Sequence, residues 1–387
     1  MRVIVAIDSF KGSLSTLDAG YSASEGVKRV FPDAECIISP LADGGEGTLE
    51  AIISATGGKY VELPVCGPLG EIVMAKYGVT PDGCAVIEMA SAAGITLVPE
   101  KSRNPLYTTT YGVGELIKHA IVSGCRHFTV GIGGSSTNDG GIGMLSALGF
   151  RFLGEDGKEV PRGAIGLQKI SKIDTSDVMP ELSECEFSVA CDVKNPLCGE
   201  NGCSAVYGPQ KGADSEMIRN MDGWLSEYAK LTAKVLGNSF ADLPGAGAAG
   251  GLGFAFLSYL GATLSSGIGV VIERTWLEEK IADADIVITG EGRLDGQSGM
   301  GKAPVGVAMA AKKHGKTVLA FAGAVTEDAR TLNALGIDAF FPIVKAPCML
   351  SEAMDIENAK RNLSDTVEQA FRIIKSLSGG KTNEIPH

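Results

Sequence analysis

Apolar runs alternate with helical stretches along most of this 387-residue chain. Residues 3–7 predict a strand, and a helix is predicted from Ser15, where Asp18 stands three residues further on at the spacing of a capping box. Strands that alternate with helices are typical of a parallel sheet joined by crossover helices. At the two ends of the chain, the predicted strands are 3–7, 36–38, 286–288, 318–321 and 339–343, and the predicted helices begin at 15 and 49 or cover 303–313, 326–334 and 358–376.

The pattern changes in the middle of the chain. Residues 59–90 hold short apolar runs separated by turn signals at 67–70 (GPLG) and 81–83 (PDG), which predict an antiparallel or mixed edge of a sheet. Further helices are predicted at 112–123, 140–148, 214–236 and 248–260, and further strands at 127–132 and near 186–191.

We therefore expect an α/β protein with two α/β domains, since a single core rarely grows beyond ~250–300 residues. Residues 1–63 and 283–378 would form a discontinuous parallel-sheet domain of Rossmann-like or flavodoxin-like type, and residues 64–282 an inserted mixed α/β domain. Residues 379–387 would be a polar tail. The active site is expected in the cleft between the two domains.

Glycine is unusually frequent, with 52 of 387 residues, about twice the usual share of ~7%. The glycines cluster at the ends of apolar runs, which is typical of ligand-facing loops and not of a linker. Five loops follow directly on predicted strands: 8–13 (DSFKGS), 42–47 (ADGGEG), 131–141 (GIGGSSTNDGG), 191–196 (CDVKNP) and 290–295 (GEGRLD). Together they predict a composite site for a small molecule.

The net charge of −12 argues against nucleic acid and anionic membranes as partners, because both require a positive surface. An anionic substrate is compatible with this charge, since it needs only a few local cations. The chain has no run of eighteen apolar residues, and its first apolar run ends after five residues at Asp8, so neither a membrane span nor a signal peptide is expected. Nine cysteines without a C-x-x-C spacing predict reduced thiols in a cytoplasmic protein.

Residues 289–302 (TGEGRLDGQSGMGK) form the most informative loop. They lie between a predicted strand and a predicted helix, where backbone N–H groups, a helix N-terminus and a cation would converge on a phosphate. Residues 296–302 match the first seven positions of a P-loop, but Ala303 replaces the Ser or Thr that would bind Mg²⁺. We therefore expect a phosphate or acidic-substrate site that is not a true P-loop. A glycine-rich surface loop with solvated charges is the alternative.

The polar side chains of these loops support a narrow range of chemistry. Lys11 and Lys302 can each offer a charge to phosphate, and Arg293 can hold phosphate or carboxylate through two parallel hydrogen bonds. Two carboxylates could hold Mg²⁺ together with nucleotide oxygens, and one could accept a proton from a substrate hydroxyl. The candidate carboxylates are Asp43, Glu46, Asp139, Asp192, Glu291 and Asp295.

Two glycine-rich segments allow more than one interpretation. Residues 133–137 offer backbone donors and three hydroxyls to a phosphate or a small carboxylate, although residues 138–140 (NDG) also form an ordinary helix-cap sequence. Residues 245–250 match the G-x-G-x-x-G pattern of dinucleotide-binding folds. The required strand cannot precede them because Pro244 adjoins the first glycine, so we expect a tight start of a helix there.

Seven blocks carry a resemblance to a known family: 8–13 (DSFKGS), 40–48 (PLADGGEGT), 104–117 (NPLYTTTYGVGELI), 133–141 (GGSSTNDGG), 207–213 (YGPQKGA), 244–251 (PGAGAAGG) and 289–297 (TGEGRLDGQ). In this order, and across nearly the whole chain, they resemble the type I glycerate kinases of bacteria. The resemblance implies two α/β domains around a cleft, transfer of the γ-phosphoryl group of ATP to D-glycerate with Mg²⁺, and usually 2-phosphoglycerate as product. Ser136, where the family usually has Ala, and Tyr207, where Phe is common, are small departures. Ser136 adds a hydroxyl to the site loop and could alter the substrate range.

The family frame allows roles to be assigned as hypotheses. Because in-line phosphoryl transfer depends mainly on positioning and charge stabilisation, Lys11 would stabilise the transferring group and Asp192 would act as the base or orienter for the attacking hydroxyl. Mg²⁺ candidates are Asp295, Glu291 and Asp139. The expected substrate-binding and phosphate-binding residues are Asp8, Ser9, Asp43, Gly44, Gly45, Gly134, Ser135, Ser136, Thr137, Asn138, Arg293 and Lys302. For any single carboxylate, a supporting or capping role is an alternative.

Two other functional classes stay open. An NAD-dependent dehydrogenase or a non-catalytic binding protein could also take a small hydroxy acid. The expected partners are D-glycerate and ATP, in a monomer or a homodimer, with no nucleic acid and no membrane. The sequence does not determine which hydroxyl of glycerate is phosphorylated.

Overall fold

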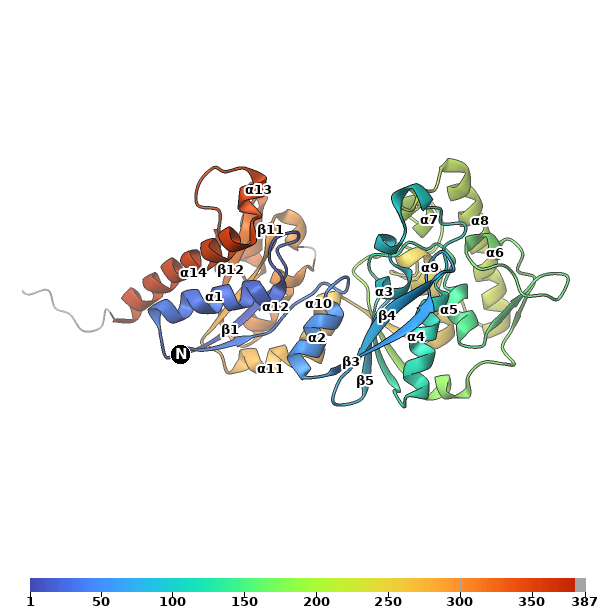
Figure 1. The fold of residues 1–387 in the computed structure, drawn as a ribbon, viewed down its shortest axis with the longest axis horizontal. Coiled ribbons are helices and arrows are strands. Elements are labelled where there is room, and N and C mark those ends of the chain that lie inside the picture. The colour runs from blue at the N-terminus through green and yellow to red at the C-terminus, as the bar shows by residue number, and fades with distance from the viewer. Residues whose placement is uncertain (300, 380–387) are drawn as a thin grey trace, which may run out of the picture. The chain divides into compact units, whose positions relative to one another are not determined.

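The computed structural model describes residues 1–299 and 301–379 of the chain. The chain divides into two compact units (Figure 1): unit 1 is Met1–Ala42 with Val271–His387, and unit 2 is Asp43–Val270. Unit 2 is therefore an insertion in the sequence of unit 1. Most of the predicted polar tail, residues 380–387, lies outside the described residues.

The observed division differs from the predicted domain boundaries, which followed residues 63 and 282. Residues 43–63 belong to unit 2 because α2 (Thr48–Thr56) packs on the sheet of that unit. The side chain of Ile53 lies so close to Gly78 that a Cβ atom added there would be 2.4 Å from it. This contact between distant segments cannot be recognised from the apolar pattern of either one.

Unit 1 contains a five-stranded sheet, in the order β13-β12-β11-β1-β2, in which all neighbouring strands are parallel. The strands are β1 (Arg2–Ile7), β2 (Glu35–Ile38), β11 (Ile286–Leu294), β12 (Thr317–Val325) and β13 (Ala339–Pro342). Counted along the chain within the unit, this is the 2-1-3-4-5 order of flavodoxin-like sheets, so the predicted parallel-sheet fold is confirmed. The strand order reverses between β1 and β11, which is the place where doubly wound sheets bind ligands.

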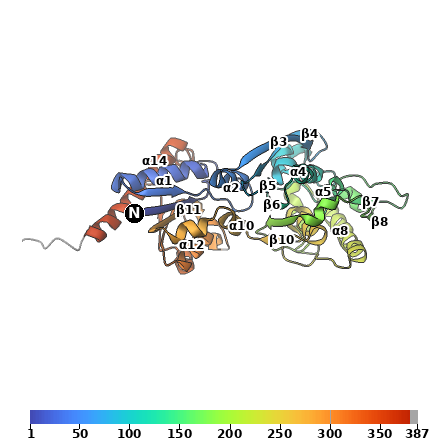
Figure 2. The same cartoon turned by 90° about the horizontal axis from the view of Figure 1, so that it is seen from below.

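Helices cover both faces of the unit 1 sheet (Figure 2). On one face lie α1 (Thr16–Val30) and α14 (Ile356–Gly379), and on the other lies α12 (Ala303–Lys313). The Ser15 hydroxyl accepts a hydrogen bond from the Asp18 N–H at 3.1 Å, which confirms the predicted helix start.

Unit 2 is built on a six-stranded sheet in the order β10-β9-β6-β5-β4-β3. Strands β5, β6, β9 and β10 are parallel, whereas β3 and β4 are antiparallel, so the predicted mixed edge is confirmed. The strands are β3 (Lys59–Cys66), β4 (Ile72–Val79), β5 (Cys84–Glu88), β6 (His127–Gly131), β9 (Glu186–Ala190) and β10 (Thr263–Ser265). The main helices are α4 (Tyr111–Val122), α5 (Ile142–Ala147), α8 (Ser215–Leu236) and α9 (Ala248–Leu260), at the predicted places.

Shorter elements complete the two units. They are α3 (Ala90–Ala93), α6 (Ala164–Leu167), α7 (Cys203–Tyr207), α10 (Gly267–Arg274), α11 (Leu277–Ala282), α13 (Leu350–Ala353), a hairpin of β7 (Arg151–Leu153) and β8 (Lys172–Asp174), and the 3₁₀ helices Ile95–Leu97, Glu100–Ser102, Pro180–Glu184, Pro209–Lys211, Gly296–Gly299 and Glu327–Leu335. Two predictions need correction. The helix expected at 326–334 is a 3₁₀ helix, and β11 continues to Leu294, six residues beyond the predicted strand.

Two predictions concern the chain as a whole. None of the described helices combines the length and the apolar character that a membrane span requires. The nine cysteines all lie within the described residues and form no disulfide. Cys84, Cys125 and Cys203 are buried, whereas Cys348 is exposed.

Candidate functional site

The carboxyl ends of β1 and β11 place two sequence-predicted loops next to each other in unit 1. The Asp8 N–H donates a hydrogen bond to the Gly290 carbonyl at 2.9 Å, which continues the pairing of the two strands. Gly290 also faces β12 so closely that a Cβ atom would lie 2.0 Å from the Phe321 carbonyl oxygen. Glycine at this position therefore lets β11 lie close to β12 beside the carboxyl end of β1, at the reversal of strand order.

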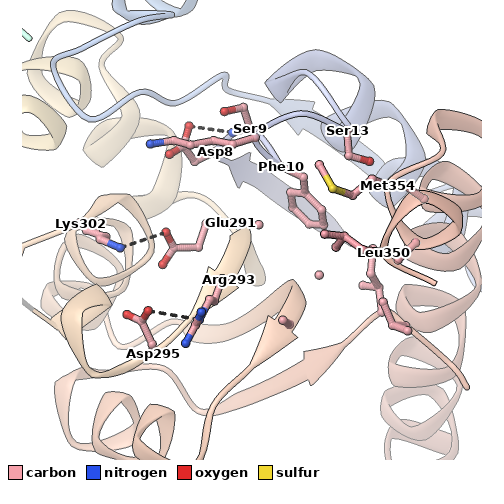
Figure 3. A pocket seen from close by; sticks show the side chains of 18 residues that line it. Asp8, Ser9, Phe10, Ser13, Glu291, Arg293, Asp295, Lys302, Leu350 and Met354 are labelled. Carbon is pink, nitrogen blue, oxygen red and sulfur yellow. Dashed lines mark hydrogen bonds and ion pairs between the residues drawn. The ribbon is translucent and has the colours of Figure 1, made fainter. Parts of the chain in front are cut away.

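A cavity of about 530 Å³ opens at these strand ends (Figure 3). Its volume lies within the usual range for small-molecule sites, ~300–1,000 Å³. Of the residues predicted for the site, it is lined by Asp8, Ser9, Lys11, Glu291, Arg293, Asp295 and Lys302. All residues lining this cavity belong to unit 1.

Glu291 and Asp8 are both buried carboxylates of this cavity, and the Glu291 side chain receives a hydrogen bond from the Ser298 hydroxyl at 2.5 Å. Burial raises the pKa of Glu291 above its ordinary value, although the hydrogen bond from Ser298 and the charge of Lys302 act in the opposite direction. The Lys302 Nζ atom lies 3.9 Å from Glu291 Oε2. The Lys302 ammonium group therefore faces a carboxylate whose charged form is destabilised by burial.

Asp295 lies beside Glu291 and faces the same serine. Its Oδ1 atom is 3.5 Å from the Ser298 hydroxyl and accepts a hydrogen bond from the Ser298 N–H at 3.2 Å. Its other oxygen is 3.5 Å from Arg293 Nε, in an ion pair on the exposed side of the cavity. The charge of Asp295 also raises the pKa of Glu291. The two carboxylates thus converge on one hydroxyl and repel each other.

These two carboxylates are suited to a metal ion that a ligand brings with it. Among the described residues, no group of three or more His, Cys, Asp and Glu side chains could hold a metal ion by itself. Mg²⁺ is commonly bound by only one or two carboxylates, with phosphate oxygens and waters completing its shell. The pair Glu291 and Asp295 fits this arrangement. Asp139, the third predicted candidate, lies in unit 2.

The N-terminus of α12 supplies donors next to Lys302. Lys302 is the N-cap residue with an extended backbone, and no side chain caps this helix end. Pro304 has no N–H, so Ala303 and Val305 carry the first N–H groups of this helix; such groups have no partner within a helix, and the helix dipole favours an anion there. Lys302 and this helix end were predicted together from the sequence, and the helix begins at Ala303 as expected.

Unit 2 gathers a second set of predicted residues at the ends of its parallel strands. Asp192 follows β9, and its Oδ1 atom accepts a hydrogen bond from the Gly267 N–H at 3.0 Å. Its side chain is exposed, but partial desolvation of the carboxyl raises its pKa; the Gly267 hydrogen bond opposes this shift and the charge of Asp43 adds to it. The two aspartates are therefore neighbours whose charges interact.

The glycines of the loops in unit 2 let their backbones approach closely. A Cβ atom on Gly131 would lie 2.7 Å from the Gly44 carbonyl oxygen, and one on Gly133 would lie 2.9 Å from the Gly45 Cα atom. The Asp43–Gly45 segment therefore lies against the end of β6, where the backbone of Gly134, with φ +72°, begins the next loop. The structure thus brings Asp43, Gly44, Gly45, Gly134 and Asp192 into one region of unit 2.

The Ser136 hydroxyl is directed differently from what its place in the sequence suggests. Ser135 and Ser136 are buried, and the Ser136 hydroxyl donates a hydrogen bond to the Ala93 carbonyl at 2.9 Å. Ser136 therefore supports the loop from within instead of facing a ligand. Among the described residues, the Thr137 hydroxyl and the Asn138 Oδ1 atom are buried without a hydrogen-bond partner.

Asp139 is fully buried below this loop. Its carboxylate accepts hydrogen bonds from the Thr110 N–H and hydroxyl, both at 2.9 Å, and from the Gly141 N–H at 3.1 Å. Burial raises its pKa, and these hydrogen bonds oppose the shift. Because its oxygens already have partners, the carboxylate anchors two loops, and Glu291 and Asp295 are better candidates for a metal.

Lys211 is a buried residue of this region that the sequence did not identify. Its side chain is 2% exposed, and its ammonium group donates a hydrogen bond to the Thr137 carbonyl at 2.6 Å. Burial lowers the pKa of Lys211 to about 8, although Cys203 and Asp139 act in the opposite direction. The only indication in the sequence was that Lys211 lies between Gly208 and Gly212 in the 207–213 block. The sequence around a lysine does not show whether its side chain is buried.

Residues 245–250 form the tight helix start that was predicted, not a dinucleotide-binding turn. Ala249, Gly250 and Gly251 have positive φ angles within the first turn of α9. A Cβ atom on Gly250 would lie 2.1 Å from the Thr137 carbonyl oxygen, so the glycines allow this segment to pack on the 133–139 loop.

Comparison with known proteins gives a consistent result. The profile of the glycerate kinase family matches residues 3–375. The chain is 47% identical over 375 residues to the glycerate kinase of Haemophilus influenzae, covering 97% of this chain and 99% of that protein. It is also 47% identical over 378 residues to the glycerate 2-kinase of Escherichia coli, covering 96% and 99%. The crystal structure of a protein assigned as glycerate kinase 2 from Salmonella typhimurium LT2 has a TM-score of 0.89 at 46% identity, covering 98% of this chain and 99% of that one. The chain belongs to the glycerate kinase family.

Proposed function

We propose that this chain transfers the γ-phosphoryl group of ATP to D-glycerate and forms 2-phosphoglycerate. The observation that carries the proposal is the unit 1 cavity, which combines three cationic side chains, two converging carboxylates and a helix N-terminus at the reversal of strand order. Phosphoryl transfer requires this combination because the reaction depends on positioning and on stabilising charge. The names of the two relatives, glycerate kinase and glycerate 2-kinase, support the acceptor and the product.

The cationic residues of unit 1 would bind the phosphates of ATP. Lys302 and the first N–H groups of α12 would hold phosphate oxygens from one side. Lys11, in the loop after β1, would stabilise the charge of the transferring phosphoryl group. Arg293 is exposed at the rim of the cavity, where its planar guanidinium group could hold two phosphate oxygens at once.

Glu291 and Asp295 would hold Mg²⁺ together with the phosphates. Their mutual repulsion and the raised pKa of Glu291 would be relieved by a divalent cation. When bound with ATP, Mg²⁺ would neutralise part of the negative charge on the phosphate oxygens.

The residues of unit 2 would bind glycerate and remove the proton of its hydroxyl. Asp192 would be the base, because its raised pKa makes it a stronger proton acceptor than an ordinary aspartate and its side chain is exposed. The backbone N–H groups of Gly45 and Gly134 would bind the carboxylate of glycerate, since neither of these glycines is buried. Ser136, through its hydrogen bond to the Ala93 carbonyl, would hold the loop of Gly134 in place.

Phosphorus NMR tests the proposal directly. The pure protein is incubated with ATP, MgCl₂ and D-glycerate, and a new phosphomonoester signal should appear together with ADP. In 2-phosphoglycerate the phosphorus couples to a single proton on carbon 2, whereas in 3-phosphoglycerate it couples to the two protons of a CH₂ group. A doublet therefore supports the proposed product, and a triplet would contradict it.

Two controls separate kinase activity from the other functional classes. Omission of MgCl₂ in the presence of EDTA should abolish transfer. If no phosphoester forms but D-glycerate binds in calorimetry, the protein is a binding protein and the kinase proposal is wrong. A change in nicotinamide absorbance with NAD and D-glycerate would instead indicate a dehydrogenase.

A further inference from the structure

The unit 1 cavity has two chemically different ends (Figure 3). Lys302, Glu291 and Arg293 lie at one end, and the side chains of Phe10, Leu350 and Met354 lie at the other. The roles proposed above occupy only the charged end. The apolar end therefore needs a separate explanation.

The apolar end begins directly beside the loop that carries Lys11. Gly12, with φ +78°, lies against Met354, and a Cβ atom on Gly12 would be 2.7 Å from the Met354 methyl carbon. Phe10 is 4% exposed, and its backbone is fixed by hydrogen bonds with Leu14 at 2.9 and 3.1 Å. Phe10 of the apolar wall and Lys11 of the charged end are neighbours in the chain and both line the cavity, so one ligand can contact both ends.

Leu350 presents apolar surface to this cavity from α13. Leu350 is 73% exposed although it lines the cavity, and the same wall includes Ile343 and Val344, which follow β13. A single exposed leucine on a protein surface is ordinary. Here the leucine belongs to a continuous apolar wall inside a concave site, where a flat apolar group would remove it from water.

The size of the cavity and the separation of its charged and apolar ends favour one class of ligand. D-glycerate is a three-carbon acid and would fill only a small part of about 530 Å³. It has no apolar ring to cover Phe10, Leu350 and Met354. A nucleotide has both an anionic phosphate chain and a flat base, and these match the two ends.

We propose that the apolar wall of Phe10, Ile343, Leu350 and Met354 is the binding site for the base of the nucleotide. The phosphates extend from there past Lys11 to Lys302 and Glu291. This assignment rests on the proposed kinase function and adds to it the place and orientation of the nucleotide. It also assigns a role to the segment between β13 and α14, which the proposed chemistry does not otherwise use.

Calorimetry with two probes tests this orientation. ADP carries the base, whereas inorganic tripolyphosphate with MgCl₂ carries only the charged part. Leu350→Ser should weaken ADP binding about five- to tenfold, because part of the apolar contact with the base is lost. It should leave tripolyphosphate binding unchanged. Lys302→Ala should weaken both probes.

Leu377→Ser is the matched control, because Leu377 is 77% exposed on α14 and does not line the cavity. It should leave the binding of both probes unchanged. Equal ADP affinity in wild type and Leu350→Ser, in an enzyme that phosphorylates D-glycerate, would overturn the base site and leave the proposed function intact. An equal loss of ADP and tripolyphosphate affinity in Leu350→Ser would also overturn it. If the wild type binds no ADP and transfers no phosphoryl group, the proposed function itself is wrong.

Discussion

At the scale of single residues, Asp192 would carry the chemical step of the proposed reaction. Asp192→Asn keeps the shape of the side chain, and the amide oxygen can still accept the hydrogen bond from the Gly267 N–H. The amide cannot accept the proton of the glycerate hydroxyl. We expect kcat to fall by about 10²–10⁴ while the circular dichroism spectrum and ADP affinity stay unchanged. A variant with wild-type kcat would show that Asp192 is not the base.

The pH profile provides an independent check on Asp192. Because desolvation raises its pKa, the carboxylate loses its charge at a higher pH than an ordinary aspartate, ~3.9. The base is needed in its charged form, so kcat/KM should fall as the pH decreases through this raised value. The residual activity of Asp192→Asn should lack this acidic limb. If wild type and Asp192→Asn lost activity at the same acidic pH, another group would be responsible for the loss.

Lys211 gives a prediction about stability. Its pKa is about 8 in the folded protein, compared with 10.5 for an ordinary lysine. Below pH 8 Lys211 is charged in both the folded and the unfolded chain, so its contribution to the free energy of unfolding does not change with pH there. Between pH 8 and 10.5 the unfolded chain binds more protons than the folded one, so the free energy of unfolding rises with pH by up to about 3 kcal/mol.

Lys211→Met should remove this dependence. In urea unfolding at pH 7 and pH 10, the stability of the wild type relative to Lys211→Met should increase by about 1–3 kcal/mol at the higher pH. Lys118→Met, at an exposed position of α4, is the control and should track the wild type. A constant difference between wild type and Lys211→Met would mean that Lys211 does not titrate in this range.

At the scale of elements, the middle of β11 contains a glycine, Gly290, that the close approach of β12 requires. Gly290 pairs with Phe321 of β12, and a Cβ atom would lie 2.0 Å from the Phe321 carbonyl oxygen. Gly290→Ala should therefore destabilise the protein by about 1–3 kcal/mol in urea unfolding, because the two central strands must separate.

Gly223 provides the matched control for this substitution. It lies in α8 with open space around it, so a methyl group meets no other atom. Gly223→Ala should stabilise the protein by roughly 0.5–1 kcal/mol, because alanine loses less backbone entropy in a helix. If both variants changed stability alike, the close approach of β11 and β12 would not limit the residue at 290.

The sequence predicted the elements whose own apolar pattern is strong. The strand at β1, the capped helix α1 and the long helix α8 were all expected near their observed bounds. The extension of β11 to Leu294 was not expected from the sequence. Its alternating glycines have little preference for strands, and the segment is held in place by its pairing with β12. The assignment of α2 to unit 2 was missed for a related reason, since its packing partners follow it in sequence.

Candidate site residues could be predicted where their position next to a strand or helix was enough to identify them. They could not be predicted where their role depends on contacts with distant segments. Lys302 was placed from its position before a helix, and Glu291 and Asp295 from their position after a strand. The support role of Ser136 depends on the Ala93 carbonyl, and the burial of Asp139 depends on Thr110. These contacts link segments more than twenty residues apart, so no local pattern indicates them.

At the scale of the whole molecule, the two units have distinct proposed ligands. Unit 1 carries the cavity with the cations and the apolar wall, and unit 2 carries Asp192 and the glycine loops at the ends of β6 and β9. If each ligand binds where we propose, each should protect a different set of backbone amides from exchange. Hydrogen exchange measured by mass spectrometry can separate the two sets, because ligand binding stabilises the segments that it contacts.

We expect ADP with MgCl₂ to slow exchange mainly in residues 8–13, 290–299 and 343–354, all of which belong to unit 1. D-glycerate alone should slow exchange mainly in residues 43–48, 131–137 and 190–193 of unit 2. At a ligand concentration about 100 times its Kd, binding contributes roughly 2.7 kcal/mol, which is enough for a clear difference in exchange. Leu350→Ser, at an ADP concentration near the wild-type Kd, should reduce the ADP effect and leave the glycerate effect unchanged. Protection of residues 131–137 by ADP alone, without protection of 8–13, would instead place the nucleotide in unit 2, because ligand binding stabilises the segments that it contacts.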